Sequence, residues 1–444
     1  AYDAHLAHVV ATVTPRMILT CDELAPGLSA VAGPALPVVT VEDLSAGSFG
    51  ATPPAAERAD LALLQFTAGS SGRVRAVRVS YDALERNVAA IRTWLRWTHR
   101  DTSAFWVPHY HDMGLIGGLI APLTSRCDVW LLTPEQFVRR PVEYLRCFGE
   151  RGANLTALPA FGLDYVTRRV KPEQLDGMDF SGVRGFIVGA EPIDPAVLTR
   201  FADLLAPFGL RPGTLLPAYG LAEATLAVTG LSPGDAWTAR APASGGSAVV
   251  GCGRPLGDAR VDVVDEAGQP VEPGCTGEIV VSGGSLASGY EGAEIPGSLT
   301  AFEPPLLRSG DAGFFRDGQL FPIGRLGDGI KIRGRMLFAE TLERELCDLG
   351  YSRRDGTVVL GVRAGRPVVV WIAERLQAGG PGEGLAVLAR LAEHADVVLV
   401  ETGHGAIART SSGKPRRRLL WDAFLNDRIS GRVSLYSSRG VTTV

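Results

Sequence analysis

The chain has 444 residues, a mass of 47.0 kDa and a net charge of −4 from 44 basic and 48 acidic side chains. This near balance gives no global electrostatic attraction to nucleic acid or to an anionic membrane surface. A hydrophobic fraction of 46% excludes disorder over most of the chain, and the longest apolar stretch, 114–123, is far shorter than the ~20 residues of a transmembrane helix.

Short apolar runs predict strands at 16–20, 37–41, 62–66, 77–80, 129–132, 185–188, 213–217, 259–264 and 278–282, and again at 358–362, 368–373 and 396–400. Helical patterns fall between several of them, at 81–97, 142–151, 160–170, 195–208 and 385–394. Alternating strands and helices favour an α/β fold with substantial parallel sheet. The last three strands and the last helix predict a separate, smaller α+β unit.

The segment Gly324–Gly329, GRLGDG, separates these two parts. Three glycines in six residues favour a flexible connection, although a plain hairpin turn is the alternative. We expect a large N-terminal domain of layered α/β subdomains over 1–324, a hinge at 325–327, and a small, mobile α+β C-terminal domain over 328–444.

Six scattered cysteines without a CxxC pair predict reduced thiols and no zinc site. The first residues, AYDAHLAHVV, lack the basic start of a signal peptide, so we expect a cytoplasmic protein. Only three of the 44 basic residues are lysine, namely Lys171, Lys331 and Lys414. Because arginine has replaced almost every other lysine, each remaining one is a candidate for a functional role.

The first motif is FTAGSSGR, residues 66–73, directly after an apolar strand. Its glycines and hydroxyl residues can turn backbone N–H groups toward phosphate oxygens. No lysine follows as in a GxxxxGK[ST] loop, and a Gly/Ser-rich segment is about as often a plain turn.

The second motif is WVPHYHDMGLIGG, residues 106–118. His109 and His111 suggest a metal site, but no third ligand is near in the sequence, so we reject that interpretation. We expect an aromatic and imidazole pair lining a pocket, followed by a glycine-rich helix start that allows another segment to approach closely.

Two further motifs follow predicted strands. GAEP, residues 189–192, comes directly after GFIV, and LPAYGLAEATL, residues 215–226, is predicted to lie at a strand-to-helix transition, where open α/β sheets bind ligands. There Tyr219 could stack on a purine and Glu223 could hold Mg²⁺ on a phosphate. The alternative for this segment is a capped helix with a buried tyrosine.

The last two motifs lie nearer the C-terminus. Within residues 307–335, Asp311 stands between small residues, where a carboxylate could bind two ribose hydroxyls, and Arg325 lies on the proposed hinge. RTSSGKPRR, residues 409–417, carries Lys414 in a Gly/Ser-rich turn. A basic run is usually solvated surface, but a lysine in this lysine-poor chain favours a function.

Together and in this order, the six segments resemble the adenylate-forming superfamily of acyl-CoA synthetases, peptide-synthetase adenylation domains and luciferases. FTAGSSG is similar to its phosphate loop, YGLAEAT to its adenine and magnesium segment, SGDAGFF to its ribose aspartate, and RTSSGKPRR to its C-terminal catalytic lysine. YHDMGLIGG, GAEP and YGLAEATL most resemble fatty acyl-AMP ligases, which pass acyl groups to carrier proteins. The resemblance extends from about residue 5 to 424.

The resemblance implies that ATP and Mg²⁺ convert a carboxylic acid, fatty or otherwise lipophilic, into an acyl-adenylate for transfer to an acyl carrier protein or CoA. Lys414, Glu223 and His111 would be catalytic, Glu223 and Thr67 would hold Mg²⁺, and Gly327 would be the hinge. The implied nucleotide contacts are Thr67, Ala68, Gly69, Ser70, Ser71, Gly72, Gly189, Ala190, Glu191, Pro192, Ala218, Tyr219, Gly220, Leu221, Ala222, Asp311 and Arg325.

The chain departs from the family pattern in four places. The phosphate loop of the family ends in Pro-Lys-Gly, where this chain has Val74, Arg75 and Ala76; arginine keeps the charge but not the shape. Gly327 stands where the family usually has Asp or Lys, and 289–307 differs from the usual insertion of the subgroup. The family also has roughly a hundred residues before the point where this sequence begins.

Three other functions remain open at this stage. An acyl-CoA ligase using free CoA is the close rival, since no sequence feature separates the two acceptors. An amino-acid adenylation domain is disfavoured because its amine-binding aspartate would fall in HYHDMG, where Asp112 has a structural alternative. A non-adenylating, ligand-binding relative is suggested by Val74–Ala76 and disfavoured by Lys414 and Glu223.

Overall fold

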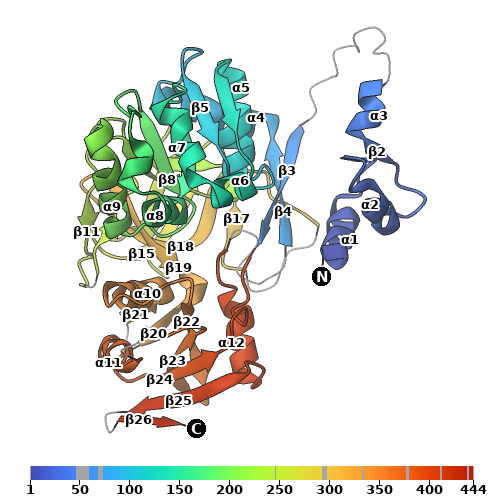
Figure 1. Ribbon diagram of the computed structural model, residues 1–444. Helices are drawn as coiled ribbons and strands as arrows, with labels where there is room; N and C mark the ends of the chain where they lie inside the picture. Colours follow the sequence, from blue (N-terminus) through green and yellow to red (C-terminus); the bar gives the residue numbers. More distant parts are fainter. Residues whose placement is uncertain are drawn as a thin grey trace.

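The computed structural model describes residues 2–46, 60–68, 74–245, 247–292, 298–332, 335–376, 380–410, 413–437 and 440–443. Figure 1 shows a large upper body, a C-terminal part below it and a small N-terminal segment at the side. The N-terminal segment contains α1 (Tyr2–Val13), α2 (Ala25–Ala32) and α3 (Val41–Ala46), with a parallel pair of short strands, β1 (Ile18–Thr20) and β2 (Val38–Thr40).

A seven-stranded sheet in the order β13-β10-β9-β8-β7-β5-β6 forms the centre of the body. Its parallel strands are β5 (Thr102–Phe105), β6 (Asp128–Leu131), β7 (Leu155–Pro159), β8 (Gly185–Gly189) and β9 (Leu215–Gly220), and the antiparallel pairs at one edge add β10 (Ala227–Gly230) and β13 (Arg254–Pro255). Every residue of β8 is buried, which explains its uninterrupted apolar sequence GFIVG. In open α/β sheets, ligands bind at the carboxyl ends of the parallel strands, so a ligand site is expected there.

Helices connect these strands, and local sequence explains where they begin. They are α4 (Tyr81–Leu95), α5 (Ala121–Ser125), α6 (Pro134–Arg139), α7 (Pro141–Gly149), α8 (Ala160–Arg169) and α9 (Pro195–Leu205), with 3₁₀ turns at Pro172–Leu175 and Ala206–Phe208. In α4 the hydroxyl of Ser80 accepts a hydrogen bond from the N–H of Ala83 (3.1 Å), which caps the first turn. The helix ends where Arg96 adopts a left-handed conformation.

Met113–Ile120 forms a π-helix, in which the expected close approach is found at Gly114. A Cβ atom there would lie 2.2 Å from the carbonyl oxygen of Pro108, so only glycine fits.

Antiparallel sheets complete the body. β3 (Leu61–Ala68) and β4 (Val74–Ser80) form a hairpin extended by β16 (Tyr290–Glu291), and β11 (Ala239–Arg240) pairs with β12 (Val249–Val250). A five-stranded sheet contains β14 (Arg260–Val264), β15 (Gly277–Ser282), β17 (Ala301–Glu303), β18 (Leu306–Arg316) and β19 (Gln319–Arg325). These strands matter for the site because β18 and β19 place Asp311 directly opposite Arg325.

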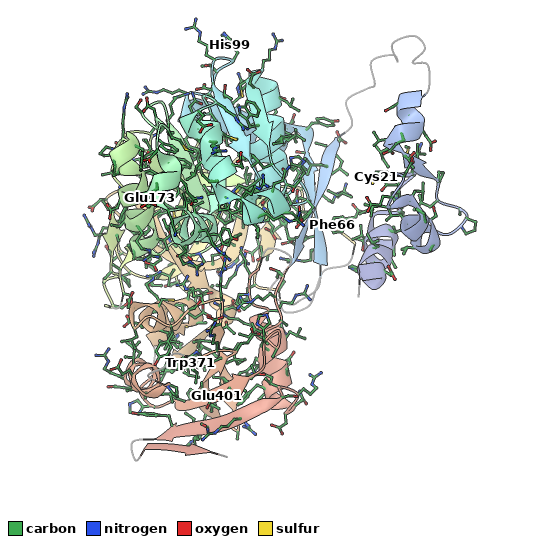
Figure 2. The ribbon with its side chains drawn as sticks, viewed as in Figure 1. Cys21, Phe66, His99, Glu173, Trp371 and Glu401 are labelled. Atoms are coloured by element: carbon green, nitrogen blue, oxygen red, sulfur yellow. The ribbon has the colours of Figure 1, made fainter. Side chains whose placement is uncertain are left out.

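The C-terminal part follows the 3₁₀ turn Leu326–Asp328 and has its own sheet and core. A hairpin of β20 (Gly329–Ile332) and β21 (Arg335–Phe338) leads into α10 (Ala339–Asp348). The sheet consists of β22 (Gly356–Arg363), β23 (Arg366–Ala373), β24 (Asp396–Thr402), β25 (Gly431–Ser437) and β26 (Gly440–Thr443), with α11 (Gly382–Leu391) and α12 (Arg417–Leu425). Buried valines and leucines of β22–β24 pack against α10 and α11 on one face and α12 on the other. In Figure 2, Trp371 and Glu401 mark this part of the chain.

The mixed α/β fold is confirmed, and each predicted strand and helix has a counterpart. One prediction is wrong: no helix follows β9. Residues Ala222–Ala224 form only a 3₁₀ turn, after which β10 returns antiparallel to β9 with Thr229 opposite Tyr219. Backbone pairing to β9 outweighs the local helix propensity of LAEATLA.

Candidate functional site

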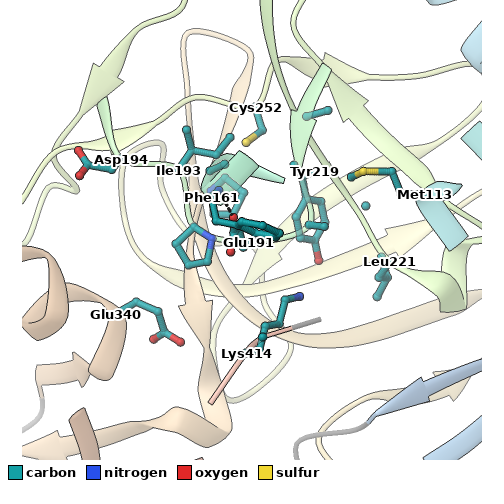
Figure 3. A pocket seen from close by; sticks show the side chains of 18 of the residues that line it. Met113, Phe161, Glu191, Ile193, Asp194, Tyr219, Leu221, Cys252, Glu340 and Lys414 are labelled. Carbon is teal, nitrogen blue, oxygen red and sulfur yellow. Dashed lines mark hydrogen bonds between the residues drawn. The ribbon is translucent and has the colours of Figure 1, made fainter. Parts of the chain in front are cut away.

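A cavity of about 1280 Å³ is lined by residues from the carboxyl ends of β7–β9 and from the C-terminal part (Figure 3). Most of the expected site residues line it: Thr67, His111, Gly189, Ala190, Glu191, Pro192, Ala218, Tyr219, Gly220, Leu221, Ala222, Glu223, Asp311, Arg325 and Lys414. Gly327 is not among the lining residues, and the side chain of Ala68 lies outside the described part of the chain. Gly69, Ser70, Ser71 and Gly72 lie outside the described residues.

The GAEP segment turns sharply after β8. A Cβ atom at Gly189 would lie 2.8 Å from the carbonyl oxygen of Ala218, so glycine lets β8 and β9 approach closely here. Ala190 has a positive φ of 65°, which is uncommon for a residue with a side chain. Glu191 then accepts a hydrogen bond from the backbone N–H of Phe161 (2.5 Å) at the start of α8. Burial raises the pKa of Glu191, while nearby Lys414 opposes this shift.

Tyr219, Asp311 and Arg325 form one hydrogen-bonded group. The Tyr219 hydroxyl donates to Asp311 Oδ2 (2.8 Å), and Arg325 Nε lies 2.8 Å from Asp311 Oδ1. Burial and the adjacent Asp311 carboxylate raise the pKa of Tyr219, so its hydroxyl keeps its proton as a donor. Asp311 raises the pKa of Arg325, which fixes the guanidinium as a cation. This arrangement orients both oxygens of Asp311 at the cavity wall.

Glu223 is buried on the 3₁₀ turn between β9 and β10 and faces the β3–β4 hairpin. Its Oε1 accepts a hydrogen bond from the Tyr290 hydroxyl (2.7 Å) and forms an ion pair with Arg75 NH2 (3.2 Å). Thr67 is the direct cross-strand partner of Arg75, and its hydroxyl is buried without a hydrogen-bond partner among the described residues. The orphaned hydroxyl of Thr67 and the carboxylate of Glu223 are both grouped around Arg75, and both are oxygen ligands of the kind that Mg²⁺ takes.

The two histidines of the second motif have different surroundings. His111 is half-buried and lines the cavity, with Nδ1 2.6 Å from Asp112 Oδ1. His109 is exposed and is not among the lining residues. Within the described ranges, no three His, Cys, Asp or Glu side chains gather as metal ligands.

Lys414 enters the cavity from a tight turn in the C-terminal part. The N–H of Thr410 donates to the carbonyl of Lys414 (2.8 Å), and the N–H of Lys414 donates to the Thr410 hydroxyl (3.1 Å). The Lys414 side chain points into the cavity on the side of Glu191 and Tyr219 (Figure 3). Removal from bulk water lowers the pKa of Lys414, and the Glu191 carboxylate opposes that shift. Lys331, by contrast, forms an exposed pair with Glu266 (2.7 Å).

Arg417, three residues after Lys414, is the centre of an ion network that the sequence did not predict. The guanidinium of Arg417 bonds to Asp328 (2.9 Å), Glu340 (2.5 Å) and Glu343 (2.8 Å). It therefore connects α12 to α10 and to the turn after β19, and it anchors the end of the loop that carries Lys414. The basic run PRRR was a signal, but a run does not reveal which arginine is buried.

Residues 2–291 match the family of proteins described as AMP-binding enzymes. The chain belongs to this family. A protein from Mycobacterium tuberculosis named for fatty-acid–CoA ligase activity, fadD25, is 31% identical over 96% of this chain and 82% of its own length. The medium-chain-fatty-acid–[acyl-carrier-protein] ligase JamA of Moorena producens is also 31% identical, over 86% of this chain and 71% of its own.

A solved structure from studies of fatty acyl-adenylate ligases of E. coli and L. pneumophila superposes on this AMP-binding enzyme with a TM-score of 0.83. It is 28% identical, and the match covers 96% of this chain and 82% of that one. The expected membership of the adenylate-forming superfamily and the expected enzyme class, a ligase, are confirmed. None of the helices in the described ranges of this AMP-binding enzyme is long and apolar enough to cross a membrane.

Proposed function

We propose that this enzyme activates a fatty or other lipophilic carboxylic acid with ATP to give an acyl-adenylate, and then passes the acyl group to the phosphopantetheine thiol of an acyl carrier protein. The main observation in favour of the adenylation step is that Lys414, Glu223 and the Asp311 group line one cavity at the ends of the strands. Apolar lining residues from α4 and the sheet, including Ile91, Trp94 and Phe105, favour a lipophilic acid.

Recognition of the nucleotide follows from the Tyr219–Asp311–Arg325 group. The Tyr219 ring offers a flat face to adenine. Each oxygen of Asp311 accepts one bond from the protein and keeps acceptor capacity, so the carboxylate can also bind ribose hydroxyls. Because Arg325 fixes this carboxylate in place, ribose binding requires little reorganisation.

Adenylation is a displacement at the α-phosphorus of ATP. An oxygen of the acid attacks, the bond from that phosphorus to the bridging oxygen breaks, and pyrophosphate leaves with the electron pair. Lys414, whose side chain points into the cavity, would neutralise charge on the acid and the α-phosphate as this charge develops. Mg²⁺ held by Glu223 and Thr67 would neutralise the triphosphate. Half-buried His111 would help to close the acid pocket against water.

In the second step the carrier thiolate attacks the acyl carbonyl and AMP leaves. We propose that 328–444 rotates about 325–327 between the steps, so that Lys414 leaves and the thiol enters. Support comes from the separate sheet and core after residue 329 and from the position of Gly327 in a short 3₁₀ turn.

The test is acid-dependent exchange of pyrophosphate into ATP over a panel of carboxylic acids. Exchange with medium-chain or long-chain acids is the expected result, and its absence with every acid would favour the ligand-binding alternative. Single-turnover transfer from purified acyl-adenylate then separates the acceptors. Efficient transfer to free CoA, and not to a phosphopantetheine-loaded carrier, would replace the carrier assignment with an acyl-CoA ligase.

A further inference from the structure

Arg75 is a buried arginine next to the carboxylate that would hold the metal. Its NH2 lies 3.2 Å from Glu223 Oε1, and its NH1 donates to the hydroxyl of Ser298 (2.7 Å). The guanidinium carbon also lies 4.2 Å from the centroid of the Tyr290 ring. Only 9% of the Arg75 side chain and 6% of the Glu223 side chain are exposed, so water screens this pair weakly.

The surroundings hold the guanidinium in this position. Ser298 binds one side of the planar fork, the Tyr290 ring covers one face, and the Tyr290 hydroxyl binds the same Oε1 of Glu223 as Arg75 does. A lysine at this place could donate to Glu223, but it could not bridge to Ser298 with a flat fork. The charge of Arg75 is therefore fixed against Glu223.

We propose that Arg75 is a resident cation that neutralises Glu223 and thereby weakens Mg²⁺ binding at this carboxylate. The inference rests on the proposed use of Glu223 and Thr67 as metal ligands. Thr67 and Arg75 are cross-strand partners, so a metal bound by Thr67 and Glu223 would lie close to the guanidinium. The Arg75 guanidinium and Mg²⁺ repel each other at one carboxylate. Because the guanidinium is held in place, it lowers the affinity of Glu223 for Mg²⁺.

The experiment titrates Mn²⁺, observed by its electron paramagnetic resonance signal, into the full chain in the presence of an ATP analogue with a non-cleavable α,β-bridge. Arg75→Gln keeps a hydrogen-bond donor but removes the charge, and we expect Mn²⁺ to bind about tenfold more tightly than in the wild type. Glu223→Gln in the Arg75→Gln background should abolish this gain, because the gain depends on the freed carboxylate.

Two further variants make the result specific. Arg78→Gln is the matched control: Arg78 lies on the same strand and pairs with Glu291 nearer the surface, so the Mn²⁺ affinity should not change. Ser298→Ala removes the hydrogen bond to Arg75 NH1, while the guanidinium keeps its ion pair with Glu223. Because Arg75 is then held less firmly against Glu223, Mn²⁺ should bind about threefold more tightly. This milder variant keeps the proposal testable if Arg75→Gln does not fold.

Unchanged or weaker Mn²⁺ binding in Arg75→Gln, or a gain that survives Glu223→Gln, would overturn the proposal. Weaker binding of the nucleotide analogue itself would instead make Arg75 a phosphate ligand. The titration needs neither acid nor turnover. A failure of pyrophosphate exchange in the wild type would thus refute the proposed function separately from this inference.

Discussion

Replacing Glu340 by glutamine should stabilise the C-terminal part at alkaline pH. The single guanidinium of Arg417 faces three carboxylates, those of Asp328, Glu340 and Glu343. Glu340 Oε2 is buried and has no hydrogen-bond partner among the described residues. Burial, together with the charges of Asp328 and Glu343, raises the pKa of Glu340 from 4.5 to about 7, although Arg417 opposes the shift.

The sign of the pH dependence follows from this raised pKa. The folded state holds the Glu340 proton more tightly than the unfolded state, so the stability from this group is fully present below pH 4.5 and is lost as pH rises to about 7. At ~1.4 kcal/mol per pKa unit, the loss at pH 8 is at most about 3.5 kcal/mol. Glutamine stays neutral, so Glu340→Gln should recover up to this amount at pH 8 and almost nothing at pH 4.5.

Glu343→Gln is the matched control on the same helix and should have the opposite sign. Burial favours its neutral form, but Arg417, the N–H of Val358 and the hydroxyl of Thr357 lower the pKa of Glu343 overall. Its charge therefore stabilises the fold at neutral pH, and this stability is lost as pH falls through the lowered pKa. Hydrogen exchange of the β23 amides, corrected for intrinsic rates, measures both free energies. A loss of stability in Glu340→Gln at pH 8, or a gain equal at pH 4.5 and pH 8, would refute the reasoning.

Three predictions concern the reaction. Lys414→Ala should slow acyl-adenylate formation by ~10²–10³ while transfer from preformed acyl-adenylate continues, and a wild-type rate of pyrophosphate exchange would contradict its role. Glu223→Gln should raise the Mg²⁺ requirement, whereas Asp311→Asn should raise the KM for ATP without a magnesium effect; the same magnesium response in both would disprove the division of roles. Gly327→Pro should permit adenylation, because its 3₁₀ turn is compatible with proline, but should block single-turnover thioester formation, and unchanged transfer would exclude a hinge there.

Much of the fold could be predicted from the sequence because local pattern and tertiary environment agree. Strands such as GFIVG are apolar throughout and buried on both faces, so a short apolar run rich in β-branched and aromatic residues and flanked by glycine identifies them. The resemblance that the six motifs carry likewise implied that His111, Glu191, Tyr219, Glu223, Asp311, Arg325 and Lys414 would share one site, and all of them line the same cavity. Short strands with polar residues, such as TSAF in β5, give no such signal because their partners, not their composition, make them strands.

Only the tertiary structure decided which side chains pair. The sequence around Glu223 predicts the start of a helix, but β10 pairs with β9, and only a single 3₁₀ turn forms between them. Arg75 stands where the phosphate loop of the family has a lysine and keeps its charge but not its shape; only the fold shows that its partners are Glu223 and Ser298, 148 and 223 residues away. Arg417 is one of several arginines in a basic run, and burial among three carboxylates from other segments sets it apart. Periodicity records which face of an element is buried, but the energy of a buried charge depends on the groups that the fold brings within a few ångströms of it.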